Sequence, residues 1–236
     1  MNKTPTVSRA EWTKARLDLM AEEKAMSKAL DALARKRREL PWVSIDKNYE
    51  FNGPNGLESM TTLFSGHRQL VVYHFMYGPD WKQGCPSCSF WADNYNGIDI
   101  HLAHRDTALV AVSNTSLENI EAYRERMGWQ FKWVSSLGSD FNRDFHVSFT
   151  AEEIESGEVQ YNFSMAKFPV TEAPGLSVFV RTDDGGIAHS YSCHGRGLDI
   201  FNGAYQMLDM TPQGRDEDSL THKMSWLRRH DEYGDQ

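Results

Sequence analysis

The chain has 236 residues, of which 40% are hydrophobic and 25% charged, with a formal net charge of −8 and three cysteines. This composition is typical of a globular protein, and the acidic balance argues against a general nucleic-acid binder. The sequence contains no run of 18 apolar residues, so we predict no membrane span. The N-terminus "MNKTPTVSRAEW" lacks the apolar core of a secretory signal, so we expect a cytoplasmic protein without a disulfide scaffold.

Residues 8–40 predict one long helix. Ser8 and Glu11 form a capping box at its start, and Pro41 ends it. Large apolar residues recur along it every seven positions, at Trp12, Leu19, Met26, Leu33 and Leu40. Such a stripe either packs on the chain's own domain or joins two copies in a homodimer. We therefore expect an N-terminal helical arm at 1–40 and one domain at 41–236.

The domain alternates apolar strands with amphipathic helices. We predict strands at 69–77, 107–115 and 129–136, helices at 88–104 and 116–127, a hairpin at 175–193 and a helical segment at 195–210. Thr115 and Glu118 are expected to cap the second of these helices, and the "DDGG" turn closes the hairpin. Parallel units followed by a hairpin predict an α/β fold with a mixed central sheet flanked by helices.

Two cysteines lie at the junction of the first strand and the first helix, in "GCPSC". Pro86 fits the first helical position, so Cys85 stands where free N–H groups and the helix dipole stabilise an anion. We therefore expect a lowered pKa for Cys85, which attacks a disulfide. Cys88, one turn later and more buried, is expected to resolve the mixed disulfide. This chemistry needs neither a cofactor nor a metal.

Pro174 stands immediately before the hairpin strand "GLSVFV". In thioredoxin-like folds a cis-proline at this place faces the cysteines and offers its backbone edge to an extended substrate. We expect Pro174 to be such a proline, the alternative being an ordinary trans-proline at the entry to a strand. With Trp81, which precedes the cysteines, and Pro86, which lies between them, it is assigned to the substrate surface.

Several segments resemble the bacterial thioredoxin-like family called domain of unknown function 899. They are "FMYGPDWKQGCPSCSFWAD", "RMGWQFKWVSSLGSDFN", "PGLSVFVR" and "RGLDIFNGAYQMLDMTPQGRDED". Members are described as dithiol–disulfide oxidoreductases. The resemblance implies a thioredoxin-like fold with a nucleophilic Cys85 and a resolving Cys88. The expected partners are a protein or small-molecule disulfide and a thiol electron donor.

One position departs from thioredoxin, which carries a buried Asp on the strand before its cysteines. Here that strand reads "LVVYHFMYG", with Tyr73 and His74 near the place. His74 is either a proton carrier for the exchange or an ordinary core histidine.

Three alternatives stay open. A thiol peroxidase would need a polarising group near Cys85, yet Lys82 stands where peroxidases carry Thr, which leaves Arg143 or Arg181 as the guanidinium. A zinc site would use Cys85 and Cys88 together with the adjacent pair Cys193 and His194. A non-catalytic thioredoxin-fold module would bind a partner through the N-terminal helix.

Overall fold

The computed structural model describes residues 4–234, so residues 1–3 and 235–236 of the predicted arm and domain lie outside the described part. The chain divides into two compact units, of which one ends at Pro41 and the other begins at Trp42. No helix among the described residues is long and apolar enough to cross a membrane.

The N-terminal unit is a single helix, α1 (Arg9–Arg38). The predicted capping box is present: the Glu11 backbone N–H donates to Ser8 Oγ, and the Ser8 N–H donates to the Glu11 carboxylate at 3.0 Å. Basic residues fill the last turn, where they interact favourably with the negative end of the helix dipole. The helix ends at Arg38, so Leu40 of the predicted stripe lies beyond it.

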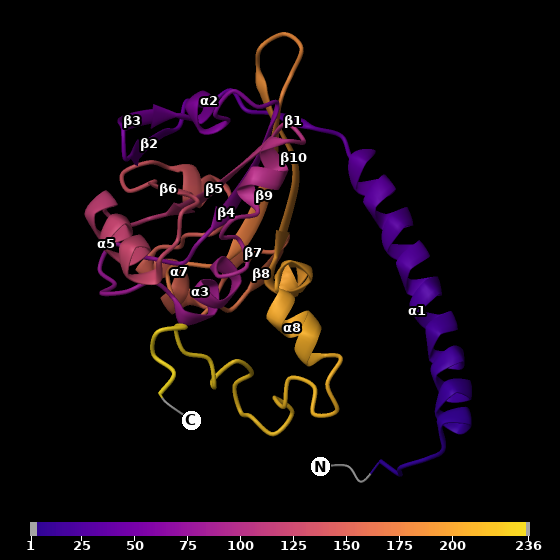
Figure 1. The fold of residues 1–236 in the computed structure, drawn as a ribbon. Coiled ribbons are helices and arrows are strands. Elements are labelled where there is room, and N and C mark those ends of the chain that lie inside the picture. Colours follow the sequence, from indigo (N-terminus) through magenta and orange to yellow (C-terminus); the bar gives the residue numbers. More distant parts are fainter. Residues whose placement is uncertain (1–3, 235–236) are drawn as a thin grey trace. The chain divides into compact units, whose positions relative to one another are not determined.

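The second unit is built on one eight-stranded mixed sheet with the strand order β1-β10-β9-β4-β5-β6-β2-β3 (Figure 1). Its strands are β1 (Val43–Ser44), β2 (Glu50–Gly53), β3 (Gly56–Ser59), β4 (Gln69–His74), β5 (Thr107–Ser113), β6 (Lys132–Ser135), β9 (Gly175–Arg181) and β10 (Ile187–His194). Strands β4, β5 and β6 run parallel, while β9 is antiparallel to β4 and β10 to β9. This is a thioredoxin-like arrangement, as the sequence predicts.

Helices cover both faces of the sheet. They are α2 (Met60–Leu63), α3 (Pro86–Ala92), α4 (Asp99–Ala103), α5 (Leu117–Met127), α6 (Phe141–Asp144), α7 (Ala151–Ser156), the 3₁₀ helix η1 (Gly195–Phe201) and α8 (Gly203–Leu208). The predicted helix 88–104 is divided into α3 and α4, with turns between them. The cap of α5 is Ser116 rather than Thr115, because the Ser116 hydroxyl accepts from the Asn119 N–H.

Side chains of the central strands alternate between two separate cores. One face, here called the thiol face, carries Tyr73, Cys88, Leu176 and Cys193 and is covered by α3, α5 and α8. The opposite face, here called the histidine face, packs Val72, Val110 and Phe179 against α2 and α6, and His74 stacks there on Phe141. Because successive strand residues point to opposite faces, neighbours in sequence are separated by the sheet.

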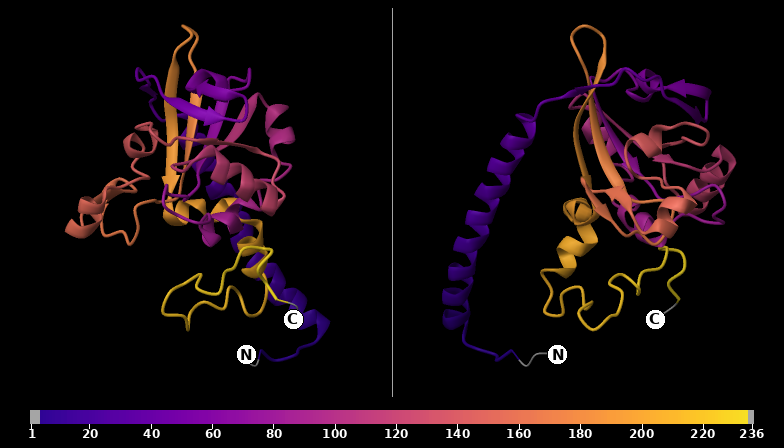
Figure 2. Two further views of the ribbon diagram at one scale, coloured as in Figure 1. Left: turned by 90° about the vertical axis from the view of Figure 1, so that its left-hand side faces the viewer. Right: turned by 180° about the vertical axis from the view of Figure 1, so that it is seen from behind.

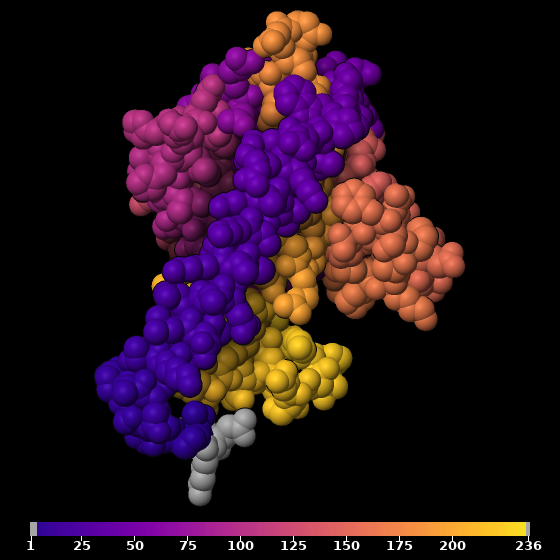
Figure 3. All heavy atoms as spheres, turned by 90° about the vertical axis from the view of Figure 1, so that its right-hand side faces the viewer, coloured from indigo at the N-terminus to yellow at the C-terminus, as the bar shows by residue number. Residues whose placement is uncertain are grey.

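Two extensions project from this sheet. The hairpin of β9 and β10 reaches past the other strands and ends in the predicted "DDGG" turn (Figure 2). The segment around α7, β7 (Val159–Tyr161) and β8 (Ser164–Ala166) forms a lobe on the side of the domain with a small core of its own (Figure 3).

Candidate functional site

Cys85 caps the start of α3. Strand β4 ends at His74, a loop follows, and Cys85 takes the N-cap position with Pro86 as the first helical residue. Its side chain makes no capping hydrogen bond and is half-buried, whereas Cys88 is buried against the thiol face. The sequence predicted this placement of both sulfur atoms relative to strand and helix.

The two thiols have opposite electrostatic environments. A hydrogen bond from the Cys88 side chain, together with the N–H groups of Cys88 and Ser87, lowers the pKa of Cys85 to about 7, although burial opposes the shift. Burial raises the pKa of Cys88 well above the usual range of a thiol, and the neighbouring Cys85 raises it further. Near neutral pH a large fraction of Cys85 is therefore thiolate, while Cys88 keeps its proton.

Tyr73, and not His74, lies beside the cysteines. The Tyr73 hydroxyl donates to the Cys88 carbonyl oxygen at 3.2 Å and also bonds the Cys88 side chain. His74 points to the histidine face, where its Nε2 contacts Ser177 Oγ at 2.8 Å. Burial lowers the pKa of His74 to about 3, so the ring is neutral. The hypothesis that His74 carries protons for the exchange is wrong, and the alternation of side chains along β4 is the reason.

Two hydroxyl groups near Cys85 were not identified from the sequence. The Ser89 hydroxyl donates to the Cys85 carbonyl oxygen at 2.9 Å and lies 2.9 Å from the Tyr123 hydroxyl. A signal for Ser89 was available, since it follows Cys85 by four residues in the predicted helix and faces back along it. Tyr123 comes from α5, and only the folded chain brings it to this place.

Pro174 immediately precedes β9, and Gly175 pairs with His74 at the end of β4. No peptide bond within residues 4–234 is cis, so the expectation of a cis-proline is wrong. The Pro174 carbonyl oxygen accepts a hydrogen bond from the Tyr161 hydroxyl at 2.8 Å, and the same hydroxyl accepts from the Gly195 N–H. The lobe thereby ties the start of β9 to the end of β10.

A family model described as "Bacterial protein of unknown function (DUF899)" matches residues 1–233. The chain belongs to this family. No curated protein matches it significantly.

Solved structures similar to the DUF899 chain include peroxiredoxins. A mutant PrxQ of Xylella fastidiosa has 13% identity and a TM-score of 0.45, over 70% of this chain and 95% of that one. The peroxidoxin BcpB of Mycobacterium tuberculosis has 12% identity and a TM-score of 0.46, over 69% and 90%. A peroxiredoxin Q mutant of Xanthomonas campestris has 16% identity and a TM-score of 0.42, over 71% and 95%. We therefore argue the site of the DUF899 chain from its own geometry.

The two tryptophans around the motif differ in burial. Trp81 is half-buried, and its indole lies so close to Gly78 that a Cβ there would come within 2.9 Å of Nε1. Trp91 is buried and donates from Nε1 to the Leu198 carbonyl oxygen at 2.8 Å. Trp81 is thus the tryptophan of the pair that is partly exposed to solvent.

The four residues of the zinc hypothesis are not gathered into one site. Cys193 faces the thiol core together with Cys88. His194, the next residue on β10, points the other way, toward Gly175 and the ring of Tyr161. Within residues 4–234, no group of three or more His, Cys, Asp or Glu side chains is arranged to hold a metal ion.

Both arginines of the peroxidase hypothesis lie elsewhere in the domain. Arg143 forms a two-point ion pair with Glu153, a residue of α7 in the lobe. Arg181 is at the far end of β9, where its guanidinium donates to the Thr61 carbonyl oxygen. Strand β9 is antiparallel to β4, so Arg181 lies beside the start of β4, at the opposite end of the strands from the cysteines.

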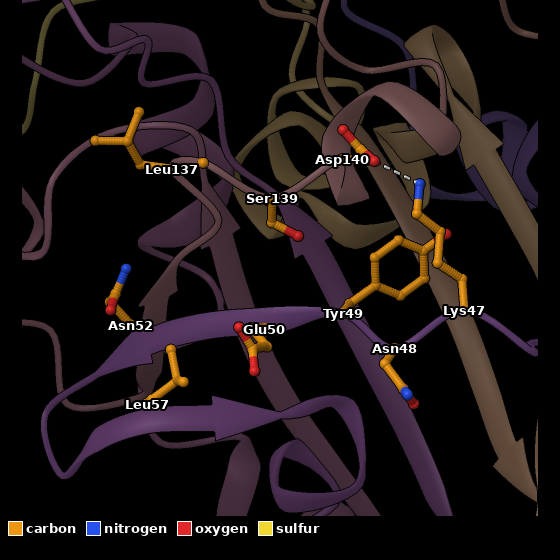
Figure 4. Close-up of a pocket in the computed structure, with 10 residues that line it drawn as sticks. Lys47, Asn48, Tyr49, Glu50, Asn52, Leu57, Leu137, Ser139 and Asp140 are labelled. Carbon is orange, nitrogen blue, oxygen red and sulfur yellow. Dashed lines mark hydrogen bonds and ion pairs between the residues drawn. The ribbon is translucent and has the colours of Figure 1, made fainter.

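A cavity of about 300 Å³ lies between β2 and the loop that follows β6 (Figure 4). Lys47 at its rim bonds Asp140 and Asp144 at 2.7 Å, and Tyr49 also bonds Asp144. None of the residues predicted for the site lines it. Since the Lys47 ammonium is already paired with two carboxylates and no predicted site residue lies here, we assign the cavity no role in the chemistry.

Proposed function

We propose that this chain is a thiol–disulfide oxidoreductase that uses Cys85 and Cys88. The single observation that carries the proposal is the asymmetry of the two thiols. Cys85 is half-buried, at a helix start, with a pKa lowered to about 7. Cys88 is buried one turn later with its pKa raised. Such a pair provides one attacking and one resolving sulfur.

In the proposed reaction the Cys85 thiolate attacks one sulfur of a disulfide substrate. A bond forms between that sulfur and Cys85 Sγ, the substrate's S–S bond breaks, and the departing thiolate takes a proton from water. Cys88 then loses its proton and attacks Cys85 Sγ, which releases the second substrate thiol. The substrate gains two electrons and two protons, and the protein ends with a Cys85–Cys88 disulfide. An external dithiol restores the reduced pair by the reverse exchange.

Trp81, Pro86 and Pro174 remain our proposed substrate surface. Trp81 and Pro86 are half-buried beside Cys85 and leave part of each ring accessible. Pro174 contributes less than a cis-proline would, because its carbonyl oxygen is already bonded to Tyr161. We therefore place the main substrate contact on the side of Trp81.

The substrate class is a protein or small-molecule disulfide, and the electron donor is a thiol. A reducing compartment such as the cytoplasm suits this direction of exchange. We also propose that residues 1–40 form a helical arm and residues 41–236 the thioredoxin-like domain, and that the heptad stripe of α1 joins two copies. Replacement of Leu19 and Met26 by Asp should then convert a dimer to a monomer in sedimentation experiments.

Peroxide reduction is the alternative that the site favours less. Neither Arg143 nor Arg181 faces Cys85, and Lys82 replaces the threonine that would polarise a peroxide. Consumption of peroxide with dithiothreitol as donor, lost in Cys85→Ser, would favour a thiol peroxidase over the disulfide exchange proposed here.

The test of the proposal is a trapping experiment with glutathione disulfide as the probe. Cys88→Ser should accumulate a mixed disulfide between glutathione and Cys85, because no sulfur remains to resolve it. Cys85→Ser should form none at Cys88, which is buried. Cys193→Ala is the matched control and should react as the unmodified chain does. Equal labelling of Cys85 and Cys88 in the two single variants would contradict the proposal.

A further inference from the structure

The C-terminal segment of the chain lies against the loop that leads to Cys85. In Figure 1 this segment, drawn in yellow, passes below α3. Its contact residue is Arg229, whose side chain is only 13% exposed. Arg229 Nη2 donates to the Gly84 carbonyl oxygen at 2.6 Å, and Nε donates to the Tyr123 hydroxyl at 2.7 Å. The guanidinium thus joins the residue before the nucleophile to α5.

A chain of hydrogen bonds continues from Tyr123 to Cys85 itself. The Ser89 hydroxyl has one hydrogen, which it donates to the Cys85 carbonyl oxygen. In the contact between Ser89 and Tyr123 the tyrosine is therefore the donor, at 2.9 Å. Tyr123 accepts from Arg229 and donates to Ser89, which in turn donates to Cys85. Each of the two hydroxyl groups therefore accepts one hydrogen bond and donates one.

The peptide unit between Gly84 and Cys85 is held at both polar atoms. Its carbonyl oxygen accepts from Arg229, and its N–H donates to the Met76 carbonyl oxygen at 3.0 Å. Gly84 itself is packed so tightly that a Cβ would lie 2.6 Å from the Phe75 ring. This fixation matters because the Cys85 thiolate is stabilised by N–H groups at the start of α3, which requires a fixed position of Cys85 relative to the helix.

We propose that Arg229 is a positioning residue for Cys85, and that the C-terminal segment is thereby a part of the redox site. This inference rests on the proposed function. Arg229 acts through the Gly84 carbonyl and the Tyr123 hydroxyl and does not touch the reacting sulfur. The two contacts require the planar, forked donors of a guanidinium, which an ammonium group cannot supply together.

Several charged and titratable groups surround Arg229. Its Nη1 pairs with Glu232 at 3.1 Å, and Glu232 also pairs with Arg126, which bonds Asp231. The phenol of Tyr77 lies within its electrostatic reach, as does that of Tyr123. Since two carboxylates offset the two guanidinium groups, we assign the effect of Arg229 on Cys85 to the geometry of its hydrogen bonds and not to its net charge.

Arg228 offers a matched control at the neighbouring position. Among the residues that the structure describes, its guanidinium donates to the Ser225 and Leu227 carbonyl oxygens of its own segment. Arg228→Met therefore removes the same charge from the same segment without loosening the loop before Cys85.

The experiment measures the rate of iodoacetamide alkylation at each cysteine between pH 5.5 and 9, by fragment mass spectrometry on the reduced full-length chain. In Arg229→Met we expect Cys85 to react about tenfold more slowly at pH 6, with the midpoint of its pH profile about one unit higher. Arg228→Met should stay within about twofold of the unmodified chain, and Arg229→Lys should recover little of the loss. Tyr123→Phe, which keeps the ring, should slow Cys85 about threefold.

The inference is overturned if Arg229→Met reacts with the rate and midpoint of the unmodified chain, or if Arg228→Met slows Cys85 as much. Should Arg229→Met fail to fold, Tyr123→Phe decides, since an unchanged rate and midpoint there would also overturn it. Failure of the proposed function has a different signature: Cys85 of the unmodified chain would then react no faster than Cys88, whatever the variants do.

Discussion

The two faces of the central sheet have opposite chemistry although they share the same strands. On the thiol face, the Tyr73 hydroxyl donates to the Cys88 carbonyl oxygen, and the N–H groups of Ser87 and Cys88 favour the thiolate of Cys85. On the histidine face, His74 contacts Ser177, which contacts Ser192, which contacts His189. The thiol face favours a charged thiolate, whereas burial keeps the rings of the histidine face neutral.

This difference shows that a candidate residue must be assigned to a face before it is assigned a role. Tyr73 and His74 are adjacent in sequence, yet the sheet separates their side chains. We therefore expect substitutions on the histidine face to change the stability of the fold, and substitutions on the thiol face to change the reactivity of the cysteines.

The largest expected effect is the loss of folding stability at low pH, which the buried histidines of the histidine face cause. Burial lowers the pKa of His74 to about 3 and of His194 to about 4, so the stability these groups give is present above pH 6.5 and is lost as pH falls toward 4. Each histidine should lower the free energy of unfolding by about 2 kcal/mol when the pH falls from 7 to 5. Urea unfolding at both pH values measures the loss, and His194→Phe should reduce it by about 2 kcal/mol. An unchanged pH dependence in this variant would show that His194 is not buried as a neutral ring. As a control, His194→Phe should react with glutathione disulfide as the unmodified chain does.

Glu172, which bonds Asn114 just after β5, provides an effect of opposite sign that is smaller than that of His74 and His194 together. Burial raises its pKa to about 7, against hydrogen bonds from Ser148 and Asn114. Because the folded pKa is the higher one, the stability it gives is complete below about pH 4.5 and is lost as pH rises through 7. Glu172→Gln keeps hydrogen-bonding groups toward both partners and should remove about 2.5 kcal/mol of this pH dependence between pH 5 and 8. The measurement is the free energy of unfolding in urea as a function of pH. The same pH dependence in the unmodified chain and in Glu172→Gln would mean that the carboxyl group is ionised throughout this range.

The smallest effect compares the adjacent residues of β4. Tyr73→Phe removes a hydrogen bond to Cys88, worth about 1 kcal/mol, and should slow the resolving step about fivefold. His74→Phe keeps a ring stacked against Phe141 and Phe145 and should leave that step unchanged. Stopped-flow release of glutathione from the Cys85 mixed disulfide measures both. A slower step in His74→Phe, with Tyr73→Phe unchanged, would reverse our assignment of the faces.

Much of the fold could be predicted from local signals. The apolar run of β4, the proline after Cys85, the glycine at 128 that ends α5 and the "DDGG" turn each specify their structure through nearby residues. Gly128 takes φ +66°, a left-handed conformation that suits a helix end. These signals placed both cysteines correctly relative to strand and helix.

The rest depends on contacts between distant parts of the chain. Arg229 and Gly84 are 145 positions apart, and a polar tail gives no sign of which arginine enters the domain. The hairpin of β2 and β3 joins the sheet beside β6 through the single pair of Asn52 and Ser135, which no local pattern predicts. Glu172, too, is buried only because Asn114 and Ser148 meet it.

The most direct test of the central claim is a redox titration of the reduced chain in dithiothreitol buffers of decreasing reducing power, followed by acid quenching and mass spectrometry. We predict one reversible two-electron transition, in which Cys85 and Cys88 form a disulfide with each other while Cys193 keeps its thiol. A chain that forms no such disulfide at any ratio, or that oxidises first through Cys193, would contradict the assignment of Cys85 and Cys88 as the redox pair.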